Sequence, residues 1–267
     1  GADPETGSIG FYLEGLQRGK VFFGTLKDVT PHKPVVILKG GRTRLGAQSV
    51  ASHTNALAGE YTIWKAAMTQ AGAIMVETVD ELLATLTALQ PHVPRPCGNG
   101  VALVGNGGGT TVLTTDAVEE SGLTLAALQA DSRAAIDRID MPPGATIGNP
   151  TDTPIGALNQ SGGEALGQVM HCLLQDATVH GLVVHFNLGA FINYDNRQDI
   201  ADGVSAALRS VATSPKPVYV ALRATPDPAI EAVRRRILAT TRQVGLPYFQ
   251  SAHEAVRTLG AVYRYCC

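Results

Sequence analysis

Short apolar runs alternate with amphipathic stretches along the whole chain, and this alternation limits the possible folds more than any other feature. Several of the runs are continuous and not alternating, and those at residues 34–39 and 181–186 are apolar at every position but one. Strands that are buried on both faces of a parallel sheet have this appearance. Alternating strands and helices form right-handed crossover units. The sequence therefore predicts an α/β fold with doubly wound parallel sheets.

The boundaries of the expected elements follow from the same pattern. Strands are expected at residues 8–13, 34–39, 73–76, 101–105, 123–126, 181–186, 218–223 and 247–249. Helices are expected at residues 15–29, 61–70, 79–89, 110–121, 164–175, 195–213, 228–244 and 251–263.

A proline-rich segment divides the chain. Residues 91–100 contain Pro91, Pro94 and Pro96, followed by two glycines. Proline disfavours helix and stiffens such a segment, which is typical of an extended linker. We therefore expect one domain at residues 1–90, a linker at 91–100 and a second, flavodoxin-like domain at 101–267. With about three strands, the first domain is expected to be incomplete at its N-terminus.

The composition excludes several classes of protein. The 21 Lys and Arg residues nearly balance the 23 Asp and Glu residues, which gives no electrostatic footprint for nucleic acid or membrane binding. No apolar run approaches the roughly 20 residues that span a bilayer, and no secretory signal is recognisable, so we expect a cytoplasmic protein. The cysteines lack metal-ligand spacing and are expected to be reduced, although one of the terminal pair is alternatively a reactive surface thiol: Cys97, Cys172, Cys266 and Cys267.

The remaining charged groups suggest no further site. The spacing of His171, His180, His185 and His253 fits no metal centre, so we interpret them as helix, turn or core residues. Three consecutive arginines at 234–236 lie on a predicted helix, where they point in different directions. A solvated helix face therefore explains them better than an anion site.

One histidine stands in an unusual setting. After the strand at 34–39 comes a glycine-rich turn, and His53 then follows among small residues. Small side chains allow a bulky group to approach the ring, and we expect a loop here that lasts until a helix near Tyr61. Taken alone, a single histidine is more often a hydrogen-bonded loop or core residue than a reactive one.

Four motifs, in the same order and at compatible spacings, resemble those of the ADP-forming (NDP-forming) acyl-CoA synthetases, relatives of succinyl-CoA synthetase. They are D-P-E-T with I-G-F-Y-L-E-G at residues 3–15, the region 33–59 with S-H-T-N-A-L-A-G, the strand and N-G-G-G at 101–109, and N-P-T-D at 149–152. Together they resemble the central, phosphohistidine-bearing part of the family. Two residues depart from its pattern: Asn55 replaces the usual glycine, and Arg44 replaces a frequent acid.

The resemblance implies that His53 carries a phosphoryl group between an acyl phosphate and a nucleotide. In this chemistry one nitrogen of a neutral imidazole attacks phosphorus, while the other nitrogen keeps its proton and directs it toward an acceptor. The resemblance implies that Glu14, at the end of the first strand, is this acceptor. The alternative for Glu14 is a solvated carboxylate at a strand end.

A glycine-rich turn between a strand and a helix is the second candidate site. Free backbone N–H groups at a helix N-terminus, together with the helix dipole, favour a bound anion. A tight turn without any ligand is the alternative. We predict that five residues bind phosphate here: Asn106, Gly107, Gly108, Gly109 and Thr110.

Asn149 and Asp152 lie in a proline-bounded loop, where both side chains are explained by hydrogen bonds to local backbone. The resemblance makes them weaker candidates for the substrate or phosphate pocket. The residues suggest no metal site.

For function, the resemblance implies part of an acid–thiol ligase that interconverts a carboxylic acid, CoA and ATP with acyl-CoA, ADP and phosphate. The complete enzyme is expected to use CoA, ATP/ADP and Mg, none of them bound by this chain alone. The implied partners are a CoA-binding domain, an ATP-grasp domain or subunit and a small carboxylic acid, in an oligomer. The isolated chain is therefore expected to be inactive. The alternative is a noncatalytic acyl-CoA-sensing or regulatory module, which Asn55 favours and the retained His53 and Glu14 oppose.

Overall fold

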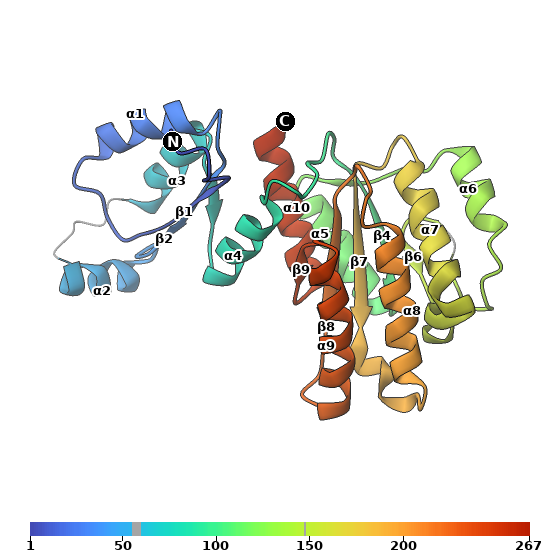
Figure 1. Ribbon diagram of the computed structural model, residues 1–267. Helices are drawn as coiled ribbons and strands as arrows, with labels where there is room; N and C mark the ends of the chain where they lie inside the picture. The colour runs from blue at the N-terminus through green and yellow to red at the C-terminus, as the bar shows by residue number, and fades with distance from the viewer. Residues whose placement is uncertain (55–59, 147) are drawn as a thin grey trace. The chain divides into compact units, whose positions relative to one another are not determined.

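The computed structural model describes residues 1–54, 60–146 and 148–267, with the side chains of residues 53 and 54 excluded (Figure 1). Asn55 lies outside the described residues. The chain divides into two compact units, Gly1–Pro91 and His92–Cys267. Each unit contains a parallel sheet with helices, so the predicted α/β fold is confirmed. Among the described helices, none combines the length and the apolar character that a membrane crossing requires.

The first unit contains a three-stranded sheet in the order β1-β2-β3. Its elements are β1 (Ile9–Leu13), α1 (Gly19–Val29), β2 (Val35–Lys39), α2 (Arg44–Thr54), α3 (Tyr61–Gln70), β3 (Ile74–Val76) and α4 (Val79–Ala88). The central strand β2 is buried along its whole length. On one face Val35 and Ile37 join a core with α1 and α3. On the other face α4 contacts β1 and β2, and the leucines of α4 lie over Gly10.

The helix α2 corrects the sequence prediction of a loop from the glycine-rich turn to Tyr61. The side chain of Thr43 begins the helix, because its Oγ1 accepts a hydrogen bond from the N–H of Gly46 at 3.1 Å. A Cβ on Gly46 would lie 3.2 Å from the Cα of Gly41. The small residues therefore allow the helix to pack closely against the turn, and they do not indicate a loop.

The second unit contains a six-stranded parallel sheet in the order β5-β4-β7-β8-β9, with β6 also paired to β4. Its strands are β4 (Gly100–Asn106), β5 (Thr124–Leu125), β6 (Thr151–Asp152), β7 (Gly181–Asn187), β8 (Val218–Arg223) and β9 (Tyr248–Phe249). Its helices are α5 (Gly108–Glu120), α6 (Ala130–Asp137), η1 (Ile155–Gly163), α7 (Glu164–Gln175), η2 (Leu188–Asn193), α8 (Arg197–Ser210), α9 (Pro228–Gln243) and α10 (Ala252–Cys266).

Helices cover both faces of this sheet. Alternate residues of β7, including Val184 and Phe186, join α7, α8 and α9 in the large core. On the opposite face α5 and α10 pack against each other and against the strands (Figure 1). The chain leaves β4 for β5 on one side and returns to β7 on the other. The carboxyl ends of β4 and β7 therefore border a topological switch point, where doubly wound sheets bind ligands.

Candidate functional site

The carboxyl ends of β4 and β7 are joined by a side-chain amide. Asn106, the last residue of β4, is 2% exposed. Its Oδ1 accepts the backbone N–H of Asn187 at 2.9 Å, and its Nδ2 donates to the carbonyl of Asn187 at 3.3 Å. Both ends of the amide are thus bonded to the last residue of β7. This geometry supports a role for Asn106 in shaping the switch point, and phosphate binding by its side chain stays a prediction.

The turn that follows presents exposed backbone. Gly107 has a φ of +101°, a conformation that favours glycine. Its carbonyl accepts the N–H groups of Thr110 and Thr111 at 2.9 and 3.2 Å, which closes the first turn of α5. The first N–H groups of a helix lack partners within the helix. Gly108 and Gly109 hold these positions and are exposed, so their N–H groups are available to an anion.

A carboxylate of the protein already lies beside this turn. The pairing of β6 with β4 places Asp152 opposite Gly105. Its Oδ1 accepts the N–H of Gly107 at 2.9 Å, and its Oδ2 would lie 3.3 Å from a Cβ on Gly108. A carboxylate is stabilised at the positive end of a helix dipole. The structure therefore brings Asp152 to the predicted phosphate turn through a contact within the protein.

The side chain of Asn149, the other weak candidate, bonds to the edge of β4 in the gap between β5 and β6. The edge of β4 pairs with β5 near Val101 and with β6 from Val104 onward. In the gap Asn149 accepts the N–H of Leu103 at 3.0 Å and donates to the carbonyls of Val101 and Ala126 at 2.9 and 3.0 Å. Both N–H groups of its amide are engaged in this way. The geometry supports a structural role, and substrate binding by Asn149 stays a prediction.

We expect Asn149→Ala to lower the free energy of unfolding of the second unit by about 2–4 kcal/mol, because buried groups of β4 lose their partners at about 1–3 kcal/mol each. Urea titration followed by circular dichroism measures the change. The exposed Asn193 supplies the control, and Asn193→Ala is expected to alter stability by less than about 0.5 kcal/mol. Equal urea midpoints for the two variants would contradict the structural role.

A neutral histidine is buried behind the turn. His185 of β7 is 2% exposed, and its Nε2 lies 3.3 Å from Thr111 Oγ1. Burial lowers the pKa of His185 to about 4, although the charge of Asp152 opposes the shift. The imidazole is therefore neutral near pH 7, and within the described part of the chain its Nδ1 has no hydrogen-bond partner. The interpretation of His185 as a core residue agrees with this position.

A cavity of about 520 Å³ opens next to the turn, between α5 and the start of α10. Thr110 lines it from α5, while Asn187, Arg223 and His253 line it from the carboxyl ends of β7 and β8 and from the start of α10. Sequence reasoning did not name Asn187 or Arg223 as site residues. The available signal was their position, because Arg223 ends one predicted strand, Asn187 directly follows another, and ligands bind at the carboxyl edge of such sheets.

In the first unit, Glu14 follows directly after β1. The hydroxyl of Tyr12 donates to Glu14 Oε1 at 3.2 Å. Lys39, the last residue of β2, donates to the carbonyl of Glu14 at 2.7 Å. The backbone of His53 lies in the last turn of α2, but its side chain is outside the described residues. The predicted pairing of Glu14 with His53 therefore stays a prediction.

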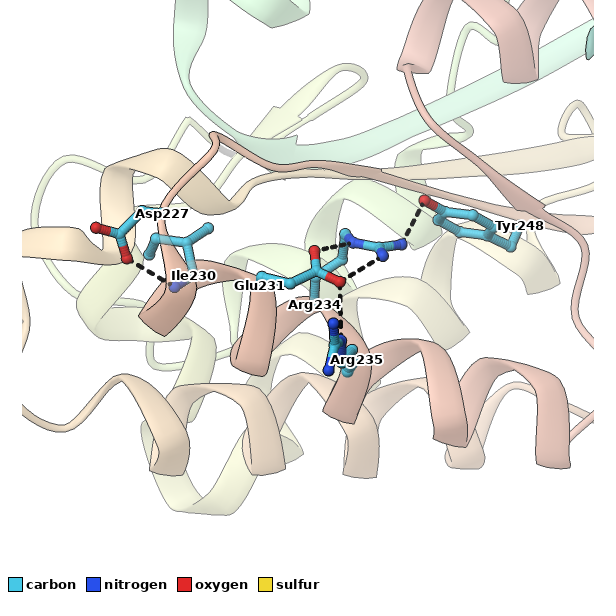
Figure 2. Close-up of polar contacts among 6 residues, drawn as sticks. All are labelled: Asp227, Ile230, Glu231, Arg234, Arg235 and Tyr248. Atoms are coloured by element: carbon cyan, nitrogen blue, oxygen red, sulfur yellow. Dashed lines mark hydrogen bonds and ion pairs between the residues drawn. The ribbon is translucent and has the colours of Figure 1, made fainter.

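The three consecutive arginines of α9, residues 234–236, are each paired with an acid. Figure 2 shows the Glu231 carboxylate in contact with both Arg234 and Arg235. Its oxygens lie 2.7 Å from the Nε of Arg234 and 3.0 Å from the Nε of Arg235. Hydrogen bonds from Arg234 and then Arg235 lower the pKa of Glu231 to about 2. Arg236 pairs with Asp202 of α8. These ion pairs support the interpretation of the three arginines as part of a solvated helix face, and they do not indicate an anion site.

Both units of the chain match known protein families. Residues 1–89 match the model of the succinyl-CoA ligase like flavodoxin domain, and residues 101–267 match that of the Ligase-CoA domain. The alpha subunit of an ADP-forming acetate–CoA ligase II from Pyrococcus furiosus is 35% identical over 80% of this chain and 45% of its own length. An ADP-forming 4-hydroxybutyrate–CoA ligase from Nitrosopumilus maritimus is 29% identical over 98% of this chain and 35% of its own length.

Among solved structures, a dinucleotide-forming acetyl-coenzyme A synthetase 1 from Ca. Korarchaeum cryptofilum, in complex with phosphate and ADP, superposes with a TM-score of 0.79. It is 28% identical, and the match covers 99% of this chain and 54% of that chain. The chain thus spans about half the length of these relatives, or less.

Proposed function

The chain belongs to the Ligase-CoA domain family, and on this premise we propose that it forms part of an acid–thiol ligase. The complete enzyme interconverts a carboxylic acid, CoA and ATP with acyl-CoA, ADP and phosphate. Ligases among the relatives support this proposal, and they do not favour the alternative of a noncatalytic sensing module. The CoA-binding and ATP-grasp parts are assigned to partner domains or subunits, so the isolated chain is expected to form no acyl-CoA.

His53 is the proposed carrier of the phosphoryl group. An imidazole nitrogen attacks the phosphorus of the acyl phosphate, the bond from phosphorus to the acyl oxygen breaks, and the carboxylate leaves. The terminal oxygen of ADP then attacks the same phosphorus, which forms ATP and restores the imidazole. We assign Glu14 to the other ring nitrogen, where a carboxylate fixes the tautomer and stabilises positive charge on the ring.

The observation that carries the proposal is the exposed N-terminus of α5 at the switch point. Its first N–H groups lie at Gly108 and Gly109, which are exposed and carry no side chains of their own. A helix end of this kind favours a bound phosphate, because its free N–H groups and the helix dipole attract negative charge. Among the described residues, no three His, Cys, Asp or Glu side chains gather as metal ligands do.

Gly109 offers a test of the phosphate site at a single position. A Cβ there meets no atom within 4 Å, and proline is tolerated in the first turn of a helix. We expect Gly109→Pro, which removes one N–H donor, to weaken the binding of inorganic phosphate to the protein by at least about tenfold, since a hydrogen bond to a charged group contributes roughly 1.5–3 kcal/mol. Isothermal titration calorimetry measures the affinity. Gly109→Ala keeps the N–H and is the control, and equal affinities in the two variants would remove the assignment.

A further inference from the structure

Lys39 is a buried lysine that has no role in the phosphoryl transfer proposed above. It ends β2 and is 1% exposed. Its Nζ donates to the carbonyl of Glu14 at 2.7 Å and also to the carbonyl of Gly40. The ammonium further lies 5.6 Å from the centre of the Trp64 ring, a distance at which a cation and an aromatic face attract. Burial of an ammonium is unfavourable unless hydrogen bonds compensate for it, so this arrangement calls for an explanation.

The two carbonyls belong to separate segments of the chain. One follows β1 and carries the Glu14 side chain, while the other begins the turn that leads into α2. The ammonium therefore fixes the distance between these segments. Burial lowers the pKa of Lys39, and the charge of Glu14 opposes the shift.

Gly40 completes the arrangement around Glu14. A Cβ on Gly40 would lie 2.8 Å from the hydroxyl oxygen of Tyr12 and 3.4 Å from the Cγ of Glu14. The absence of that Cβ allows both side chains to lie against the turn. The position of the Glu14 carboxylate thus depends on the Tyr12 hydroxyl, on the bare backbone of Gly40 and, through the Glu14 carbonyl, on Lys39.

We propose that Lys39 is a positioning residue for phosphoryl transfer at His53 and acts through Glu14. This inference rests on the proposed function, because it takes the carboxylate of Glu14 as the partner of the imidazole. Lys39 is assigned no contact with the phosphoryl group. Its role is geometric: a misplacement of about 1 Å in a catalytic group can lower a rate by about a hundredfold, and two hydrogen bonds from one ammonium prevent such a displacement.

The test is a double-mutant cycle in the complete enzyme that contains this chain. The rate of acid-labile phosphate uptake from γ-labelled ATP is measured for Lys39→Met, Glu14→Gln and the double variant. We expect Lys39→Met to be slower than wild type by at least about tenfold, and to cause little further loss once Glu14 is replaced. Residues in one network show such non-additivity, whereas independent structural effects add.

A matched control and a conservative variant complete the design. Lys33 also donates from Nζ to a backbone carbonyl, that of Asp3, but near the surface, and Lys33→Met is expected to label at the wild-type rate. Lys39→Arg keeps a cation with N–H donors and is expected to recover part of the lost rate. If Lys39→Met does not fold, as thermal melting will show, Lys39→Arg takes its place in the cycle.

The outcomes separate the inference from the proposed function. Labelling of Lys39→Met at the rate of Lys33→Met, or an equal loss with and without Glu14, overturns the positioning role. Absence of label in the wild type, or full label in His53→Ala, overturns the proposed function itself, since these enzymes retain Lys39.

Discussion

The complete enzyme with His53→Ala will take up no acid-labile, base-stable phosphate from γ-labelled ATP, whereas the wild type becomes labelled. Alanine has no nitrogen that can attack phosphorus, so the covalent intermediate cannot form. Removal of a covalent nucleophile lowers enzymatic rates by many orders of magnitude, and we expect the label to fall at least about a thousandfold. Filter binding after base and acid treatment measures the phosphate held on nitrogen.

Two variants of the first unit sharpen this experiment. His32 is exposed, and His32→Ala is expected to label like the wild type, which excludes a general effect of losing a histidine. Glu14→Gln is expected to label more slowly than the wild type but faster than His53→Ala, because glutamine keeps an acceptor oxygen and loses the charge. Undiminished label in His53→Ala would remove the phosphohistidine mechanism.

The strands that form the two sheets could be predicted because burial on both faces leaves a plain signal in the sequence. In β2 and β4 all residues are buried, and both appear as apolar runs that end in one polar residue. The two-residue strand β6 has no such run, since its place is set by pairing with Val104 and Gly105 more than 40 residues away. Local sequence does not encode a pairing of this kind.

The turn at Gly107–Gly109 could also be predicted, because a strand followed by glycines and a helix fixes a local geometry. The partners of the side chains around it could not. Asn106 and Asn149 are both amides next to glycine or proline, yet tertiary contacts direct one to β7 and the other to the edge of β4. The same holds for Lys39. A lysine at the end of an apolar strand is typically solvated, and the tertiary contact with the carbonyl of Glu14 keeps this one buried.

The glycines before α2 mislead sequence reasoning for a related reason. Glycine and alanine among polar residues are typical of loops, but Gly46 lies within a helix that packs against Gly41. Small residues at such a contact permit close approach of two backbone segments. Sequence alone does not separate a glycine that is needed for approach from one that is needed for flexibility.

Gly105→Ala is expected to destabilise the second unit severely. Gly105 pairs with His185 across β4 and β7. A Cβ at this position would lie 2.1 Å from the carbonyl oxygen of His185 and 2.5 Å from two atoms of its ring. The oxygen belongs to the neighbouring strand of the sheet, so it cannot move away without opening the ladder. We therefore expect a loss of at least about 3 kcal/mol, above the usual range for overpacking.

Because a domain is stable by only about 5–15 kcal/mol, such a loss should shift the urea midpoint of the second unit strongly or prevent its purification. Gly109→Ala, four residues along, introduces the same methyl group into open space and is expected to unfold like the wild type. A second variant identifies the clash. His185→Ala in the Gly105→Ala background relieves the contact with the ring but leaves the contact with the backbone oxygen, so most of the destabilisation should remain. Full recovery of stability in the double variant would show that the imidazole, and not the approach of the two strands, requires glycine at position 105.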